Sequence, residues 1–229
     1  PSSAASDVYK RQLLMVLKIP WRIAVLGSVA FAFSTYLLII LQVGHNTKAL
    51  AISYIPLVVA GLVLLRQNKI LPGFLISLIG ISLQIRANHY QMTYYMLIFL
   101  GVYFIVYLVD SYRKKDLKQY LKYIGVFALA GILSLGLNAP NILSTYDYSK
   151  YSTRSQSELT LNPDGTEKER TSGLDYDYIT QYSYGVFESL NLVAPRIQGG
   201  ASSEDLGEKS NLYKFLIDNN VPKPQADSF

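Results

Sequence analysis

Long apolar runs alternate with short polar stretches over the first 137 residues of the chain. A helix of about 20 apolar residues spans the hydrocarbon of a bilayer. The third of the runs has about 16 residues and rises only about 24 Å as a helix, so we expect it to be short, tilted or re-entrant. The pattern predicts an all-α polytopic membrane protein with about five transmembrane helices. The expected spans are residues 23–43, 49–65, 70–85, 92–109 and 120–137.

The remaining residues, 138–229, contain no apolar run that would cross a membrane, and they are rich in Tyr, Ser and Asp. Apolar residues recur at helical spacing over 179–192, and a second short helix is expected over 211–219. We therefore expect a transmembrane region over 13–137, followed by a segment outside the membrane with short helices.

The two ends of the chain lack the alternation of apolar runs and short polar stretches. Residues 1–12 have neither an initiator Met nor the basic-then-apolar order of a signal peptide. They resemble a translated adaptor and are set aside from the fold as a non-native leader, the alternative being a genuine polar leader. Residues 221–229 stop in irregular sequence, so we expect the natural protein to continue beyond both ends.

Charge is distributed unevenly along the chain. The net charge of +5 divides into a strongly basic part up to residue 137 and an acidic part after it. The Lys and Arg residues lie between apolar runs, where they set membrane topology, so we exclude nucleic-acid binding. The chain has no Cys, which excludes disulfides and thiolate metal sites.

The loops between the apolar runs predict an orientation. Two basic residues, Lys48 and Arg86, fall on one side of the membrane. Because cytoplasmic loops carry the excess of Lys and Arg, we expect the other side and the N-terminal part to be cytoplasmic and 138–229 to be extracytoplasmic, in a multi-pass membrane protein. The basic residues expected on the cytoplasmic side are Lys18, Arg22, Arg66, Lys69, Arg113, Lys114, Lys115, Lys118 and Lys122.

A polar cluster between the third and fourth runs is the first candidate site. Arg86 supplies a fixed cation, His89 a titratable imidazole, and Asn88 and Gln91 supply amides. Arg grips phosphate in a fork, and the N-terminus of the following helix favours an anion, so these residues suit a phosphate or sugar group. In the alternative interpretation Arg86 snorkels to lipid phosphate and His89 caps a helix within a Tyr-rich interfacial belt.

The extracytoplasmic segment holds further candidates. Arg154 and Glu158 lie in a Tyr-rich stretch that suits phosphates and sugar rings, although a solvated connector has the same composition. Asp175 and Asp177 would hold a divalent cation through carboxylate oxygens, or they begin a helix. No other metal site is expected. The chain has no Walker A loop, dinucleotide Gly motif, Gly-x-Ser-x-Gly elbow or His-Glu-x-x-His pattern.

Several segments carry a family resemblance when read in order. The stretches are Ala87 to Tyr95, Asn138-Ala139 ahead of Tyr146 to Lys150, Tyr151 to Arg154 with Ser157 to Leu159, and Thr171 to Asp175 through Tyr178 to Gly185. Together they resemble the YfhO family of bacterial membrane proteins, in its Bacteroidetes branch, over residues 20–200.

The resemblance implies a membrane glycosyltransferase of the GT-C type in the bacterial cytoplasmic (inner) membrane. Such a protein takes a sugar from a polyprenyl-phosphate carrier at the outer face and transfers it to a cell-surface glycan acceptor. It implies carrier-phosphate contacts for Arg86, His89 and Arg154, and sugar or acceptor contacts for Asn88, Gln91 and Glu158. The acidic catalytic residue of the family is expected before residue 13, so this chain alone is expected to be inactive.

Two other classes of function stay open. Pro56 and Pro72 interrupt apolar runs, as in transporters or flippases of lipid-linked or polar solutes. No Asp or Glu lies in mid-span, which is where a transporter of that kind would carry charges. The third class is a non-catalytic membrane assembly protein whose acidic segment binds a partner.

Overall fold

The structure is a computed structural model that describes residues 2–152, 179–181, 183, 185–193, 197 and 207–223. It contains two compact units, Pro1–Gln181 and Tyr182–Phe229, which are described separately. All regular elements among the described residues are helices, as the apolar pattern predicted.

The first unit is a bundle of helices. Four of its segments are long and apolar enough to cross a membrane within the described part of the chain: Trp21–Gln42, Asn46–Arg66, Tyr90–Arg113 and Leu117–Leu137. The helices are α1 (Ser2–Val16), α2 (Trp21–Ala32), α3 (Thr35–Gln42), α4 (Asn46–Arg66), α5 (Ile70–Arg86), α6 (Tyr90–Arg113), α7 (Leu117–Leu137) and α8 (Ala139–Ser149).

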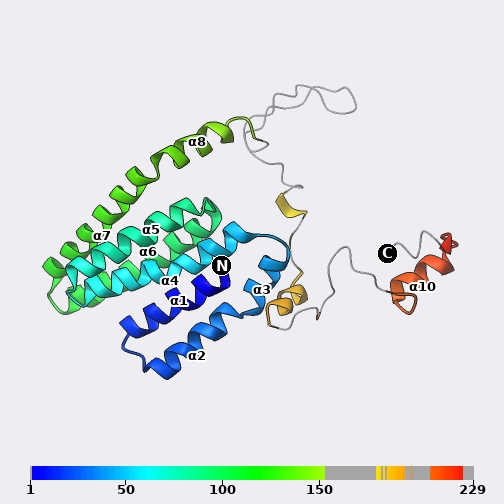
Figure 1. The fold of residues 1–229 in the computed structure, drawn as a ribbon, viewed down its shortest axis with the longest axis horizontal. Helices are drawn as coiled ribbons and strands as arrows, with labels where there is room; N and C mark the ends of the chain where they lie inside the picture. Colours follow the sequence, from blue (N-terminus) through cyan, green and yellow to red (C-terminus); the bar gives the residue numbers. More distant parts are fainter. Residues whose placement is uncertain are drawn as a thin grey trace. The chain divides into compact units, whose positions relative to one another are not determined.

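Helix α4 is the centre of this bundle, with α1 along one side and α5 along the other (Figure 1). It is the most buried of the candidate spans. Helix α5 packs so closely that a Cβ added to Gly61 of α4 would lie 2.4 Å from Ser77 Oγ. Gly73 meets Leu65, and Gly80 meets Val58, so α5 runs antiparallel to α4. The third apolar run is therefore a short helix that follows α4 and does not turn back within the membrane.

The turns between the helices share one backbone form. Each places a residue with positive φ two positions after the last helical residue, at Lys18, Gly44, Asn68, Asn88 and Lys115. This left-handed residue closes the C-terminus of a helix by bonding its N–H back to the last turn, as the Asn68 N–H does to Leu65 O at 2.8 Å. Turns of this kind, three or four residues long, bring successive helices back antiparallel.

These turns gather at two ends of the bundle. The Arg86 end comprises the turns 43–45 and 87–89 and the junction at Asn138. The Asp110 end comprises the turns 17–20, 67–69 and 114–116; there Arg66 and Lys114 pair with Asp110 at 3.5 and 2.9 Å.

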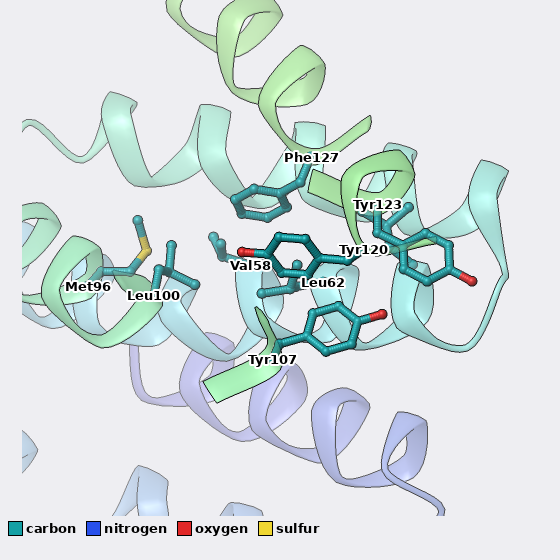
Figure 2. Packing of buried hydrophobic residues seen from close by; sticks show 9 residues of the cluster. Val58, Leu62, Met96, Leu100, Tyr107, Tyr120, Tyr123 and Phe127 are labelled. Carbon is teal, nitrogen blue, oxygen red and sulfur yellow. The ribbon is translucent and has the colours of Figure 1, made fainter. Parts of the chain in front are cut away.

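An aromatic core joins α4, α6 and α7 towards the Asp110 end. Val58 and Leu62 of α4 lie against Leu100 of α6 in the buried cluster shown in Figure 2. Tyr107 of α6 meets Tyr120 of α7 edge to face, with ring centroids 5.3 Å apart. Edge-to-face pairs add to the stability from buried area, so this core fixes α6 and α7 on α4.

Three segments differ from the sequence-based expectation in their helix boundaries. The first span is broken at Phe33–Ser34, where Ser34 is extended with φ −60° and ψ 142°. Residues set aside as a leader form most of α1, whose buried Ser6 bonds Ser53 of α4. Helix α8 begins directly after Asn138, with Pro140 in its first turn, where a missing N–H is tolerated.

The second unit contains two short helices among its described residues. The 3₁₀ helix η1 spans Phe187–Leu192, and α10 spans Asn211–Asp218 with Ser210 accepting the N–H of Tyr213 as its N-cap. The prediction of a helix over 211–219 is therefore confirmed. The single helix expected over 179–192 is wrong, because Ser183 and Gly185 within it are irregular.

Candidate functional site

The turn between α5 and α6 carries the first candidate cluster. Arg86 is the last residue of α5, Asn88 has φ 53°, and His89 precedes α6. Asn tolerates left-handed backbone better than most residues because its short polar side chain bonds locally. The turn itself therefore explains why Asn stands at position 88, apart from any ligand.

Two other parts of the chain lie beside this turn. The charges of Lys48 and His45, from the turn between α3 and α4, act on His89. Thr145 of α8 donates to Asn88 Oδ1 at 3.4 Å. Both histidines of the chain are thus at the Arg86 end, and His45 belongs to the surroundings of His89, which the sequence alone did not indicate.

His89 is partly buried, and its Nδ1 atom is enclosed without a hydrogen-bond partner. Burial lowers the pKa of His89 below its ordinary value; its own backbone carbonyl acts in the opposite direction, and Lys48 and His45 lower the pKa further. A His with a lowered pKa is a neutral imidazole at pH 7. It can therefore exchange hydrogen bonds without adding a charge.

Positive charge collects at the Arg86 end. Arg86 is exposed, Lys48 lies over the Tyr36 ring at 5.2 Å, and neither forms an ion pair within the described part of the chain. The N-termini of α4 and α6 both lie here, with no side-chain cap and no acidic residue in the first turn. Helix N-termini carry partial positive charge, so the two cations and two helix ends act in the same direction.

Gln91 takes a different place from the other residues of the cluster. Its Nε2 donates to the Tyr95 hydroxyl one turn further along α6, at 2.9 Å, on an exposed surface. Tyr90, Tyr94 and Tyr95 are also exposed. This arrangement fits an interfacial aromatic belt. The Gln91 amide would have to break its hydrogen bond to Tyr95 in order to bind a ligand.

The candidates of the extracytoplasmic segment, Arg154, Glu158, Asp175 and Asp177, lie outside the described residues. Among the residues that are described, no group of three or more His, Asp or Glu side chains is arranged to hold a metal ion.

Sequence reasoning missed a buried part of this site. Gln84 is fully buried in the last turn of α5, and its Nε2 donates to Thr93 Oγ1 of α6 at 3.3 Å. The spacing Gly73, Ser77, Gly80, Gln84 was the available signal, because these positions follow one face of a helix. Small residues on such a face mark close packing in membranes.

Comparison with known protein families gives a match over most of the chain. Residues 13–185, more than half of the chain, match the family described as bacterial membrane protein YfhO. The chain belongs to the YfhO family. With its four candidate spans it is a membrane protein whose apolar helices lie in a lipid bilayer. No curated protein and no solved structure matches this YfhO-family chain.

Proposed function

We propose that this YfhO-family chain is part of a membrane glycosyltransferase that takes a sugar from a polyprenyl-phosphate carrier and transfers it to a cell-surface glycan. In this proposal the Arg86 end binds the phosphate of the carrier. The observation that carries it is that Arg86 and Lys48, which form no ion pair with any described residue, lie beside the uncapped N-termini of α4 and α6.

The electrostatics of this end favour an anion over a neutral or cationic group. Each helix N-terminus contributes roughly half a positive charge, and an anion there gains about 0.3–1 kcal/mol at an exposed position. A hydrogen bond to a charged partner contributes about 1.5–3 kcal/mol. Asp147, the acidic residue of α8, is occupied by Lys150 at 2.8 Å and leaves these cations free.

The neutral imidazole of His89 supports the same proposal. It offers one N–H to the bound sugar-phosphate carrier without adding a third full charge, since its pKa is lowered by burial and by Lys48. Binding an anion raises the pKa of a neighbouring His. Carrier binding is therefore expected to strengthen as the pH falls towards the pKa of His89 in the complex.

The charges at the two ends of the bundle support a location for the site. The Arg86 end carries two basic residues, Arg86 and Lys48, whereas the Asp110 end carries nine. These nine are Lys18, Arg22, Arg66, Lys69, Arg113, Lys114, Lys115, Lys118 and Lys122. By the positive-inside rule the Asp110 end is cytoplasmic. The proposal thus puts the phosphate site at the outer face of the cytoplasmic membrane.

The remaining roles stay predictions within this proposal. Arg154 is a second phosphate contact, while Asn88, Gln91 and Glu158 contact the sugar or the acceptor. Asp175 and Asp177 offer carboxylates to a divalent cation. No described residue is assigned as the catalytic base.

A transporter or flippase is the second candidate, favoured by the break at Phe33–Ser34 within the first span. Interrupted membrane helices bind substrates in several transporter folds. Such a protein would move a carrier across the bilayer without cleaving its sugar, so transport and transfer can be separated by experiment.

The test is sugar transfer in bacterial membranes that express the chain from its complete gene, with radiolabelled sugar on undecaprenyl phosphate. Arg86→Ala and His89→Ala are each expected to reduce transfer at least tenfold, with unchanged membrane insertion. Arg113→Ala is the matched control, because Arg113 is exposed in the last turn of α6 as Arg86 is in the last turn of α5.

Unchanged transfer in both Arg86→Ala and His89→Ala would refute the proposed role of the Arg86 end. Movement of labelled carrier across vesicles without any transfer would favour the transporter.

A further inference from the structure

The buried face of α5 ends in a polar side chain at the candidate site. Gly73, Ser77 and Gly80 of this face are small residues packed on α4, whereas Gln84 is a large amide with no exposed surface. Gln84 lies two residues before Arg86 in the last turn of α5, on the buried side of the helix, whereas Arg86 is exposed.

Two polar atoms, one of this amide and one of His89, have no hydrogen-bond partner among the described residues. Gln84 Nε2 donates to Thr93 Oγ1 at 3.3 Å, and Thr93 Oγ1 donates to the backbone carbonyl of His89 at 3.4 Å. The other atom of the amide, Gln84 Oε1, is enclosed without a hydrogen bond, and so is His89 Nδ1. Thr93 thus joins the Gln84 side chain to the backbone of His89, and each of these two residues holds one unsatisfied side-chain atom.

Unsatisfied buried atoms of this kind are uncommon. A buried acceptor without a partner loses about 1–3 kcal/mol relative to a satisfied one, and the large majority of buried side-chain polar atoms are paired. Two such atoms, on residues joined through Thr93 at the Arg86 end, point to a partner that arrives with the ligand.

The chemistry of the two atoms restricts that partner. Gln84 Oε1 can only accept, so the partner carries an O–H or N–H group. His89 Nδ1, in a neutral imidazole, accepts or donates according to which ring nitrogen holds the proton. A hydroxyl group serves both atoms by donating its hydrogen to Gln84 Oε1 and accepting the N–H of His89 Nδ1, whereas a fully ionised phosphate has no hydrogen to give to Gln84. An ammonium group is disfavoured by Lys48 and Arg86.

We propose that Gln84 and His89 bind a hydroxyl group of the carrier-linked sugar, next to the phosphate at Arg86. This inference rests on the proposed function and extends it, because it makes Gln84 a residue that distinguishes a sugar-loaded carrier from the bare carrier. Thr93 is a positioning residue, since it holds the Gln84 amide with its oxygen free.

The test measures binding of two probes by the whole chain in lipid nanodiscs. One probe is undecaprenyl phosphate, and the other is undecaprenyl phosphate loaded with glucose, galactose, mannose or N-acetylglucosamine in turn. The wild-type protein is expected to bind at least one loaded carrier about tenfold more tightly than the bare carrier. This preference corresponds to about 1.4 kcal/mol.

Gln84→Met keeps the side-chain volume and removes the amide. It is expected to abolish the preference for the loaded carrier and to leave the affinity for bare undecaprenyl phosphate within twofold. Thr93→Val is a second variant, isosteric and on the more accessible helix α6, and it is expected to weaken the preference in the same way.

Ser77→Ala is the matched control, because Ser77 is fully buried on the same face of α5 and also has an unpartnered atom. It lies seven residues from Gln84, about 10 Å along the helix, and its loss is expected to leave both affinities unchanged.

The outcomes separate the inference from the proposed function. If bare undecaprenyl phosphate binds but no loaded carrier is preferred, or the preference survives in Gln84→Met and Thr93→Val, the inference is wrong and the pair holds only water. If neither probe binds, the proposed function itself fails.

Discussion

The contact between α4 and α5 gives the sharpest prediction for the fold that positions the site. A Cβ placed on Gly61 would lie 2.4 Å from Ser77 Oγ, 2.6 Å from Ser77 N and 2.9 Å from Ser77 Cα. The hydroxyl can rotate away, but the two backbone atoms cannot. In Gly61→Ala the two helices must therefore separate.

The magnitude follows from a comparison with Gly101 of α6, where an added Cβ meets nothing within 4 Å. Both glycines are inside helices, so Ala brings each the same gain in helix propensity, about 1 kcal/mol. Overpacking costs about 1–3 kcal/mol. Gly61→Ala should therefore be less stable than Gly101→Ala by about 1–3 kcal/mol.

The assay is reversible unfolding in mixed micelles with increasing dodecyl sulfate, followed by far-ultraviolet circular dichroism. Gly101→Ala is expected to equal or exceed the wild type in free energy of unfolding, and Gly61→Ala to fall below it. Equal stability of the two variants would show that α4 and α5 do not touch through their backbones, and the described position of the Arg86 turn would then be wrong.

Two further predictions concern the Arg86 end. By nuclear magnetic resonance, His89 should titrate below pH 6.5, and its signal can be assigned in a His45→Gln variant. Lys48→Gln should raise the pKa of His89, because it removes a nearby cation. A pKa unchanged by Lys48→Gln would contradict the proximity of Lys48 to His89. Because the folded-state pKa is lowered, the stability contributed by neutral His89 is complete above pH 6.5 and is lost as the pH falls through that pKa. At Asn88, with φ 53°, Asn88→Gly should leave unfolding nearly unchanged and Asn88→Val should cost about 1–2 kcal/mol; equal costs would argue against the left-handed turn.

Much of the fold was readable from the apolar runs, because the length of a membrane helix is set by the bilayer and its ends by charged residues. The run over 70–85 was correctly expected to be short. The close packing of this run on α4 was not predicted, since hydropathy reports how apolar the residues of a helix face are and not how small their side chains are. The break at Phe33–Ser34 contains neither Gly nor Pro and left no local signal.

The candidate site was predictable only in part. Arg86, Asn88 and His89 stood out because polar residues between two apolar runs are conspicuous. Lys48 and His45 come from another turn, and only the packing of α3, α4 and α6 brings them to His89. Gln84 was hidden inside an apolar run, where a single amide resembles a tolerated polar residue until its unsatisfied oxygen is seen.

The most direct test of the account is the affinity of the chain for undecaprenyl phosphate in nanodiscs, measured for the wild type, Arg86→Gln and Arg113→Gln. Loss of a hydrogen bond to a charged group, about 1.5–3 kcal/mol, predicts a dissociation constant raised at least tenfold in Arg86→Gln. Arg113→Gln, at the opposite end of the bundle, should bind as the wild type does. Equal affinities for all three proteins, or a loss confined to Arg113→Gln, would contradict a phosphate site at the Arg86 end.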